Sequence, residues 1–225
     1  MKKTLLVLSA FAILFAGCSS MSNQGKGTAI GAAAGSVLGA LIFKNDVAGA
    51  LIGAAVGGTA GNLIGRHMDK QAQELKQAIP EAAVERVGEG INVTFDSELM
   101  FKKGSDKLSE DGIDALAKVA KVFVNYPDQY ILVEGHTSAD PALASEANAK
   151  ANMKLSEQRA KAVSRYLQND GVAKASLIEK WYGGERPKFS NDQEETRAKN
   201  RRVEIGIIAN EEGRKKAEEA AANQQ

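Results

Sequence analysis

Residues 130–138 read YILVEGHTS, an apolar run that ends in polar residues. The run is short and rich in β-branched and aromatic side chains, which predicts a buried strand. Helical patterns lie on both sides of this strand. Ser109 can cap an acidic first turn, and the apolar stripe that follows it ends before Pro127. A second apolar stripe reaches Gln168, so we expect the strand to lie between two helices in the chain.

Further strands complete this pattern. Residues 84–95 alternate apolar and polar side chains on both sides of a glycine turn, which predicts a β-hairpin. Residues 177–182 and 202–208 are two more apolar runs of strand length. Two of the strand connections pass through helices, and such crossovers are right-handed, so both helices should cover one face of the sheet. We therefore expect an α+β domain over residues 82–209.

Three separated segments of this domain carry a distinctive set of residues. They are Gly135-His136-Thr137 after the first apolar run, Asn152, Leu155-Ser156 and Arg159-Ala160 on one helix, and Asn200-Arg201-Arg202-Val203-Glu204-Ile205 at the last strand. Together they resemble the signature of the OmpA-like peptidoglycan-binding domain. The resemblance implies a mixed four-stranded sheet with two helices on one face, in the order βαβαβ-β, preceded by a helical glycine-zipper hairpin.

The resemblance also implies a ligand, the diaminopimelate side chain of the peptidoglycan stem peptide, whose end carries a carboxylate and an ammonium. Arg159 suits the carboxylate because a planar guanidinium binds two oxygens at once. Asn152 and Arg159 share one helical face by their spacing. Arg201 is the second cationic candidate by family position, whereas Arg202 has a structural alternative as an ion-pair partner. The ligand-binding residues that we expect are Asp96, Thr137, Ser138, Asp140, Asn152, Arg159 and Arg201.

One position departs from the family pattern. Ser138 stands where the family has an aspartate, and the loop 139–150 is longer than the family usually has. A serine accepts a hydrogen bond but supplies no charge, and charge-assisted bonds are about twice as strong as neutral ones. Three alternatives follow: Asp140 stands in for the acid, the affinity for the stem peptide is weakened or lost, or the ligand is different.

The N-terminus has the features of an export signal. Lys2 and Lys3 precede a short apolar segment, and small residues precede Cys18. Phe15-Ala16-Gly17-Cys18 resembles a bacterial lipobox, which implies a signal peptide over residues 1–17, acyl chains such as palmitate on Cys18, and a linker over 18–24. Ser19 resembles the sorting signal for the outer membrane. The alternative is a signal peptide with an incidental cysteine.

Glycine recurs every four residues between residues 25 and 65. The two series are Gly27, Gly31, Gly35 and Gly39, and then Gly49, Gly53, Gly57, Gly61 and Gly65. On a helix each series forms a smooth stripe that another helix can approach closely. Helices over 27–43 and 47–65 would resemble the glycine-zipper hairpins of envelope lipoproteins. Membrane insertion, self-association into a homo-oligomer outside the membrane, and a flexible linker are the three alternatives.

Two polar segments flank the domain. Residues 66–81 favour a helical connector that ends at Pro80. Residues 210–225 form a charged tail without an apolar face, for which we expect a solvated helix or disorder.

Composition argues against several classes of function. The net charge is +1, which provides no basic surface for nucleic acid. Cys18 is the only cysteine, and the two histidines, His67 and His136, are far apart in the chain, so neither a disulfide framework nor a metal site is expected. No nucleophile elbow or phosphate-binding glycine loop follows a strand. We expect neither an enzyme nor a bound cofactor.

The sequence therefore predicts a lipid-anchored outer-membrane protein whose domain faces the periplasm and binds the stem peptide, so that it tethers the membrane to the cell wall. The first alternative is an envelope structural or assembly protein whose domain has weakened or lost peptidoglycan binding. A second alternative is an ion-driven stator component, which pairs a similar domain with a membrane segment.

Overall fold

The computed structural model describes residues 47–53, 56–102 and 104–223. The expected signal peptide, Cys18 and the first glycine series lie outside the described residues. The helices are α4 (Val47–Gly53), α5 (Gly58–Ala78), α6 (Ser97–Met100), α7 (Glu110–Val124), α8 (Glu146–Asn169), α9 (Glu194–Asn200) and α10 (Glu211–Ala222), with 3-10 turns η1 (Pro141–Leu143) and η2 (Lys174–Ser176). The strands are β1 (Ala83–Val87), β2 (Gly90–Asp96), β3 (Gln129–Gly135), β4 (Leu177–Trp181) and β5 (Arg202–Ala209).

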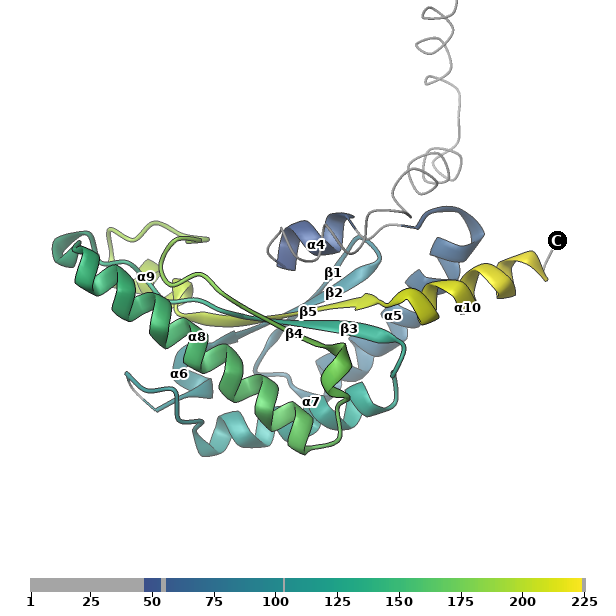
Figure 1. Cartoon of the computed structure of the whole chain (residues 1–225), viewed down its shortest axis with the longest axis horizontal. Helices are drawn as coiled ribbons and strands as arrows, with labels where there is room; N and C mark the ends of the chain where they lie inside the picture. Colours follow the sequence, from purple (N-terminus) through teal and green to yellow (C-terminus); the bar gives the residue numbers. More distant parts are fainter. Residues whose placement is uncertain (1–46, 54–55, 103, 224–225) are drawn as a thin grey trace, which may run out of the picture.

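These strands form one mixed sheet in the order β1-β2-β5-β3-β4 (Figure 1). The central strand β5 pairs antiparallel with both β2 and β3, and β3 pairs parallel with β4. The α+β class and the mixed sheet are confirmed, but the expected number of four strands is wrong. The sheet has five because β1 joins it as the edge strand, where Val84 is buried and pairs with Val93 of β2.

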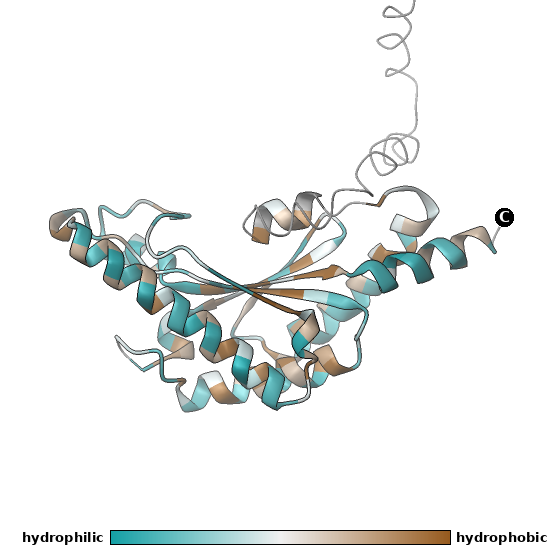
Figure 2. Ribbon diagram, in the orientation of Figure 1, coloured by the Kyte–Doolittle hydropathy of each residue, from teal (hydrophilic) through white to brown (hydrophobic). Residues whose placement is uncertain are grey.

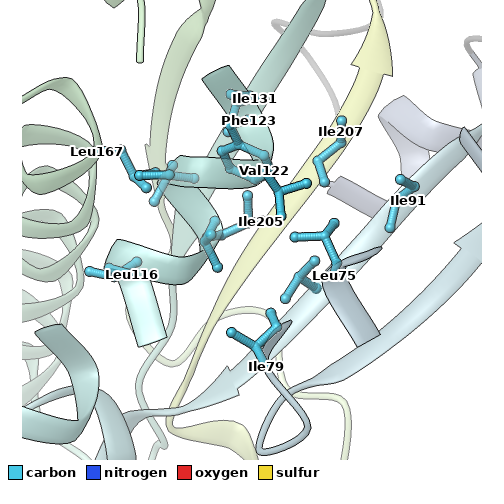
Figure 3. Close-up of a cluster of buried hydrophobic side chains, with 14 of the residues drawn as sticks. Leu75, Ile79, Ile91, Leu116, Val122, Phe123, Ile131, Leu167, Ile205 and Ile207 are labelled. Carbon is cyan, nitrogen blue, oxygen red and sulfur yellow. The ribbon is translucent and has the colours of Figure 1, made fainter. Parts of the chain in front are cut away.

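The main core lies between one face of this sheet and the helices α5, α7 and α8. Successive residues of a strand point to opposite faces, so Val203, Ile205 and Ile207 of β5 all face this core. Figure 3 shows Leu116 and Phe123 of α7 and Leu75 of α5 around Ile205 and Ile207. Apolar colour is concentrated on the strands and polar colour on the outer surface of α8 (Figure 2). The two expected helices, α7 and α8, share one face as predicted, and α5 is a third.

The short helix α4 covers part of the opposite face of the sheet (Figure 1). Val47 and Leu51 of α4 are buried against Leu132 of β3 and Ile208 of β5. The helix can approach so closely because β5 has a glycine beneath it: a Cβ at Gly206 would lie 2.7 Å from a methyl carbon of Val47. Residues 47–53 of the glycine-rich segment therefore pack on this face of the sheet.

A continuous helix over residues 47–65 is contradicted. α4 ends at Gly53 and α5 begins at Gly58, while Gly57 and Gly58 have φ angles of 70° and 66°. Glycine adopts such left-handed angles without steric strain, so the chain turns at this point. α5 then continues through the expected connector and ends before Pro80. Among the residues that the structure describes, no helix has both the length and the apolar character needed to span a bilayer.

The C-terminal helix α10 packs against α5 rather than standing free in solvent (Figure 1). Its buried residues are Arg214, Ala217 and Ala221, which lie three and four positions apart and so share one side of the helix. Alanines contribute little to an apolar pattern, so the sequence gives no sign of this face. Of the two expectations for the tail, a solvated helix or disorder, the helix is confirmed, but one side of that helix is buried.

Candidate ligand-binding site

A cavity of about 400 Å³ opens beyond the carboxyl end of β3, between α6, α8 and the start of α9. Its lining residues are Ser97, Glu98, Phe101, Gly104, Thr137, Ser138, Asn152, Leu155, Arg159, Glu194 and Arg201. Carboxyl ends of strands in α/β sheets are a common place for ligand sites. The structure thus brings together five of the seven expected site residues: Thr137, Ser138, Asn152, Arg159 and Arg201.

A close contact between α8 and β3 shapes this cavity. A Cβ at Gly135 would lie only 2.1 Å from the carbonyl oxygen of Ser156, so a residue larger than glycine would push the helix away. Ser156 also accepts a hydrogen bond from the backbone N–H of Gly183 at 2.9 Å, through its side-chain oxygen. The backbone N–H of Thr137 donates to the carbonyl oxygen of Gly183 at 2.8 Å. These contacts fix the segment after β3 and bring Arg159, one turn beyond Ser156, to the cavity.

Arg159 is a buried cation at the cavity wall, with 5% of its surface exposed. Its Nε donates to the carbonyl oxygen of Ser105 at 3.0 Å, and its guanidinium lies 5.0 Å from the centre of the Phe101 ring. Within the described part of the chain, no carboxylate oxygen lies within 4.0 Å of its nitrogens. Burial and then the charge of Arg201 lower its pKa, against a smaller opposing effect of Asp106. A buried cation without an ion-pair partner favours an anionic ligand.

Arg201, in contrast, already has two carboxylate partners. Its Nη2 lies 3.0 Å from Glu98 Oε1 and 2.8 Å from Glu194 Oε1. Burial lowers the pKa of Arg201, but the hydrogen bonds and the charges of these two glutamates together outweigh burial and raise it overall. Glu98 and Glu194 were not among the residues expected from the sequence. Arg201 and Glu98 are 103 positions apart, and only the fold brings them together.

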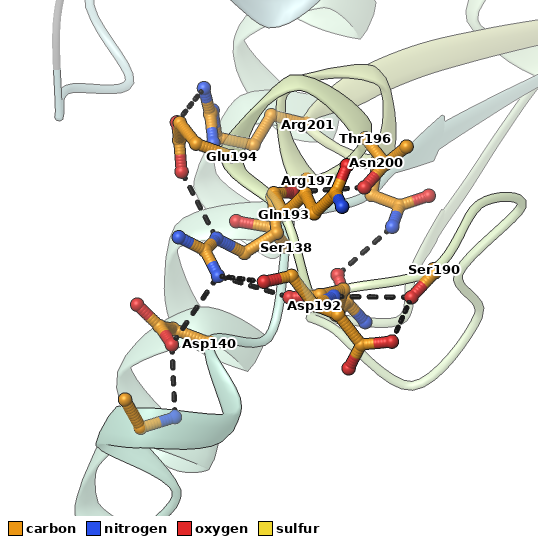
Figure 4. A network of polar contacts seen from close by, with 12 residues as sticks. Ser138, Asp140, Ser190, Asp192, Gln193, Glu194, Thr196, Arg197, Asn200 and Arg201 are labelled. Atoms are coloured by element: carbon orange, nitrogen blue, oxygen red, sulfur yellow. Dashed lines mark hydrogen bonds and ion pairs between the residues drawn. The ribbon is translucent and has the colours of Figure 1, made fainter.

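Asp140 lies outside this cavity and is held by other contacts (Figure 4). Its Oδ1 accepts a hydrogen bond from the backbone N–H of Ala142 at 2.9 Å, which caps the turn η1, and lies 3.5 Å from Arg197 Nη1. It lines a neighbouring cavity of about 510 Å³, formed largely by the long 139–150 loop. Ser138 and Asn152 line both cavities, and the Asn152 Nδ2 donates to the Ser138 carbonyl oxygen at 3.2 Å.

Asp96 and Arg202 are not among the residues that line the cavity. Asp96 is exposed at the end of β2, where it pairs in register with Arg202 of β5. Arg202 is buried, and its Nε donates to Glu204 Oε1 at 2.6 Å. Arg202 is therefore an ion-pair partner within the fold, as the alternative drawn from the sequence had it. His136 is buried too, and its ring stacks on that of Tyr182 with the centres 5.4 Å apart.

Comparison with known proteins agrees with this architecture. A model of the OmpA family matches residues 100–201, and a model of the YMGG-like Gly-zipper matches residues 1–69. The probable lipoprotein YiaD of Escherichia coli strain K12 is 33% identical over 222 residues, which cover 92% of this chain and 99% of that protein. The peptidoglycan-associated lipoprotein of Pseudomonas aeruginosa is 38% identical over 105 residues, 47% of this chain and 58% of that protein.

Solved structures show the same fold. A putative MotB-like protein from Desulfovibrio vulgaris superimposes with a TM-score of 0.58 at 24% identity, covering 66% of this chain and 95% of that chain. At this level of identity the likeness concerns the arrangement of the sheet and its helices.

Proposed function

Since this chain belongs to the OmpA-like lipoproteins that carry a YMGG-like glycine zipper, we propose that it binds peptidoglycan non-covalently and tethers the outer membrane to the cell wall. Its role is that of a binding protein, not an enzyme. The relative from Pseudomonas aeruginosa is named for its association with peptidoglycan, which supports this choice.

The observation that carries the proposal is Arg159, a buried guanidinium without a carboxylate partner in the described residues, at the wall of an open cavity. A planar guanidinium can bind both oxygens of one carboxylate. The terminal carboxylate of a diaminopimelate side chain would fill this role. Thr137, Ser138 and Asn152 line the same cavity and supply neutral polar groups around that carboxylate. The acid that receives the ammonium is a separate question, for which Asp140 is one candidate.

Membrane attachment rests on the N-terminal segments. Acyl chains on Cys18 would hold the chain in the outer membrane, with the domain facing the periplasm. One acyl chain binds a bilayer only marginally, whereas several chains or a second membrane-binding element hold it durably. The zipper segment 25–65 would provide that second element, or a surface for homo-oligomers, and α4 within it would join it to the sheet.

Sedimentation with purified sacculi tests the proposal. The full chain, kept in detergent, should sediment with sacculi, and Arg159→Ala should weaken the apparent affinity by on the order of tenfold or more, since hydrogen bonds to charged groups contribute about 1.5–3 kcal/mol. Arg165→Ala is the matched control, because Arg165 is an exposed arginine on the same helix. This control should bind as the unsubstituted chain does.

The second candidate function is a structural or assembly role in the envelope with peptidoglycan binding weakened or lost. Ser138 favours it, because the position after Thr137 carries no charge. An unsubstituted chain that stays in the supernatant at all sacculus concentrations would support this second role and contradict the tether.

A further inference from the structure

Three acids and two arginines form an alternating chain of ion pairs beside the cavity. The order is Glu98, Arg201, Glu194, Arg197 and Asp140, with separations between charged atoms of 3.0, 2.8, 3.0 and 3.5 Å. Figure 4 shows the part from Arg201 to Asp140. Because an acid stands at each end of this series of ion pairs, its five side chains together carry one negative charge in excess. Arg159 is not a member and carries one positive charge.

The cavity is therefore dipolar. Its charged lining residues are Glu98, Glu194, Arg159 and Arg201, and their charges cancel. A site for a simple anion would have a positive excess, whereas a site for a zwitterion needs an unpaired cation and an excess of negative charge at different places. Arg159 provides the first, and the ion-pair chain provides the second.

The three acids differ in how much of their charge is free to act in the cavity. Glu194 lies between two arginines, whose hydrogen bonds lower its pKa, first from Arg197 and then from Arg201. Asp140 is at the other end, lines the neighbouring cavity and caps η1. Glu98 lines the cavity of Arg159, contacts one arginine, and has 76% of its side chain exposed. Of the three, Glu98 has the least compensated carboxylate that reaches the cavity.

We propose that Glu98 binds the ammonium group of the ligand while Arg159 binds its carboxylate, so that Glu98 takes over the role of the acid that Ser138 does not supply. This inference rests on the proposed function and specifies it: the ligand is the zwitterionic end of a diamino acid, and its anionic partner comes from α6. Arg201 is a positioning residue, which holds the Glu98 carboxylate at the rim.

Calorimetric titration of the full chain in detergent with meso-diaminopimelate and with pimelate tests this assignment. Pimelate keeps both carboxylates and lacks the ammonium groups. Glu98→Gln preserves shape and removes the charge, so it should weaken diaminopimelate binding on the order of tenfold and leave pimelate binding unchanged. Glu98→Gln should not unfold the chain, because exposed ion pairs contribute little to stability. Thermal unfolding of each variant checks this.

Asp140→Asn is the discriminating variant, because Asp140 is the competing candidate for the ammonium and lines the neighbouring cavity; if Glu98 has this role, Asp140→Asn should bind both compounds as the unsubstituted chain does. A loss of diaminopimelate binding in Asp140→Asn with none in Glu98→Gln overturns the inference and assigns the role to Asp140. An equal loss of affinity for both compounds in Glu98→Gln also overturns the inference, since the effect would then act through Arg201. An unsubstituted chain that binds neither diaminopimelate nor sacculi contradicts the proposed function itself, and the inference with it.

Discussion

Replacing Gly135 by alanine tests how far the site depends on the close approach of α8 to the end of β3. The new Cβ would lie 2.1 Å from the carbonyl oxygen, 2.9 Å from the carbonyl carbon and 3.2 Å from the Cα of Ser156. All three are backbone atoms, so no rotamer change relieves the clash. The helix must move by roughly 1 Å to restore ordinary contact distances.

The expected effect is a loss of both stability and binding. Overpacking of a well-packed interior costs roughly 1–3 kcal/mol, and we expect the upper part of this range because backbone must shift. For a chain of this size the melting temperature should fall by roughly 2–4 °C for each kcal/mol. Arg159 lies one turn beyond Ser156, so its guanidinium should be displaced. Sacculus binding should therefore weaken by more than the fraction of unfolded chain explains.

Gly65→Ala is the matched control for this substitution. Gly65 lies within α5, and the nearest atom to its added Cβ would be Arg86 Nη2 at 3.9 Å. Alanine there should stabilise the helix by roughly 0.5–1 kcal/mol. Urea unfolding and sacculus sedimentation measure both variants. If Gly135→Ala kept the midpoint and the binding of the unsubstituted chain, the tight contact of α8 with β3 would not be what positions Arg159.

Two further predictions concern stability. Leu51→Ala should destabilise the chain by about 2–5 kcal/mol in urea unfolding, because it leaves a cavity between α4 and the sheet; an unchanged midpoint would mean that α4 does not pack there in solution. Burial raises the pKa of Glu204, but opposing effects, chiefly the charges of Arg202 and Lys188 and the hydrogen bond from Arg202, outweigh burial, so the pKa is lowered in the folded chain. A lowered pKa stabilises the fold above the unfolded value of about 4.3, and this stabilisation is lost as the pH falls through the folded pKa. Glu204→Gln should thus be less stable at pH 7 and lose less stability between pH 5 and pH 2, whereas parallel stability curves for the two chains would contradict this role of the carboxylate.

Local patterns predicted the elements that build the site. The apolar run before Gly135 predicted β3, and the spacing of Asn152 and Arg159 predicted that both lie on one helical face; in the structure both line the cavity. Five expected site residues line this cavity. They lie on segments whose alternation of strand and helix along the sequence had predicted a sheet with crossover helices. These predictions succeeded because strand and helix periodicity are local properties.

The remaining features depend on contacts that no local pattern encodes. Glu98 reaches Arg201 only because β2 and β5 are neighbours in the sheet, so the acidic side of the cavity was missed. The regular glycines predicted helix against helix, yet α4 packs on β5, where Gly206 provides the space. The count of four strands came from the family resemblance, whereas the alternation over residues 84–95 had predicted both strands of the hairpin, including the edge strand β1.

The position of α4 determines how the chain would transmit mechanical load. If the N-terminal end is fixed in a membrane and the cavity holds the cell wall, tension enters the described structure at Val47. α4 is a single short helix that buries Val47, Ala50 and Leu51 in a small cluster on one face of the sheet, whereas α5 is embedded in the main core on the other face. Once released and fully extended, residues 47–57 would span at most roughly 36–40 Å, and the connection would lengthen by this span less the distance that they cover when folded. The sheet and the Arg159 cavity would remain intact during that extension. Undocking of α4 would therefore let the distance between membrane and cell wall increase without release of the ligand.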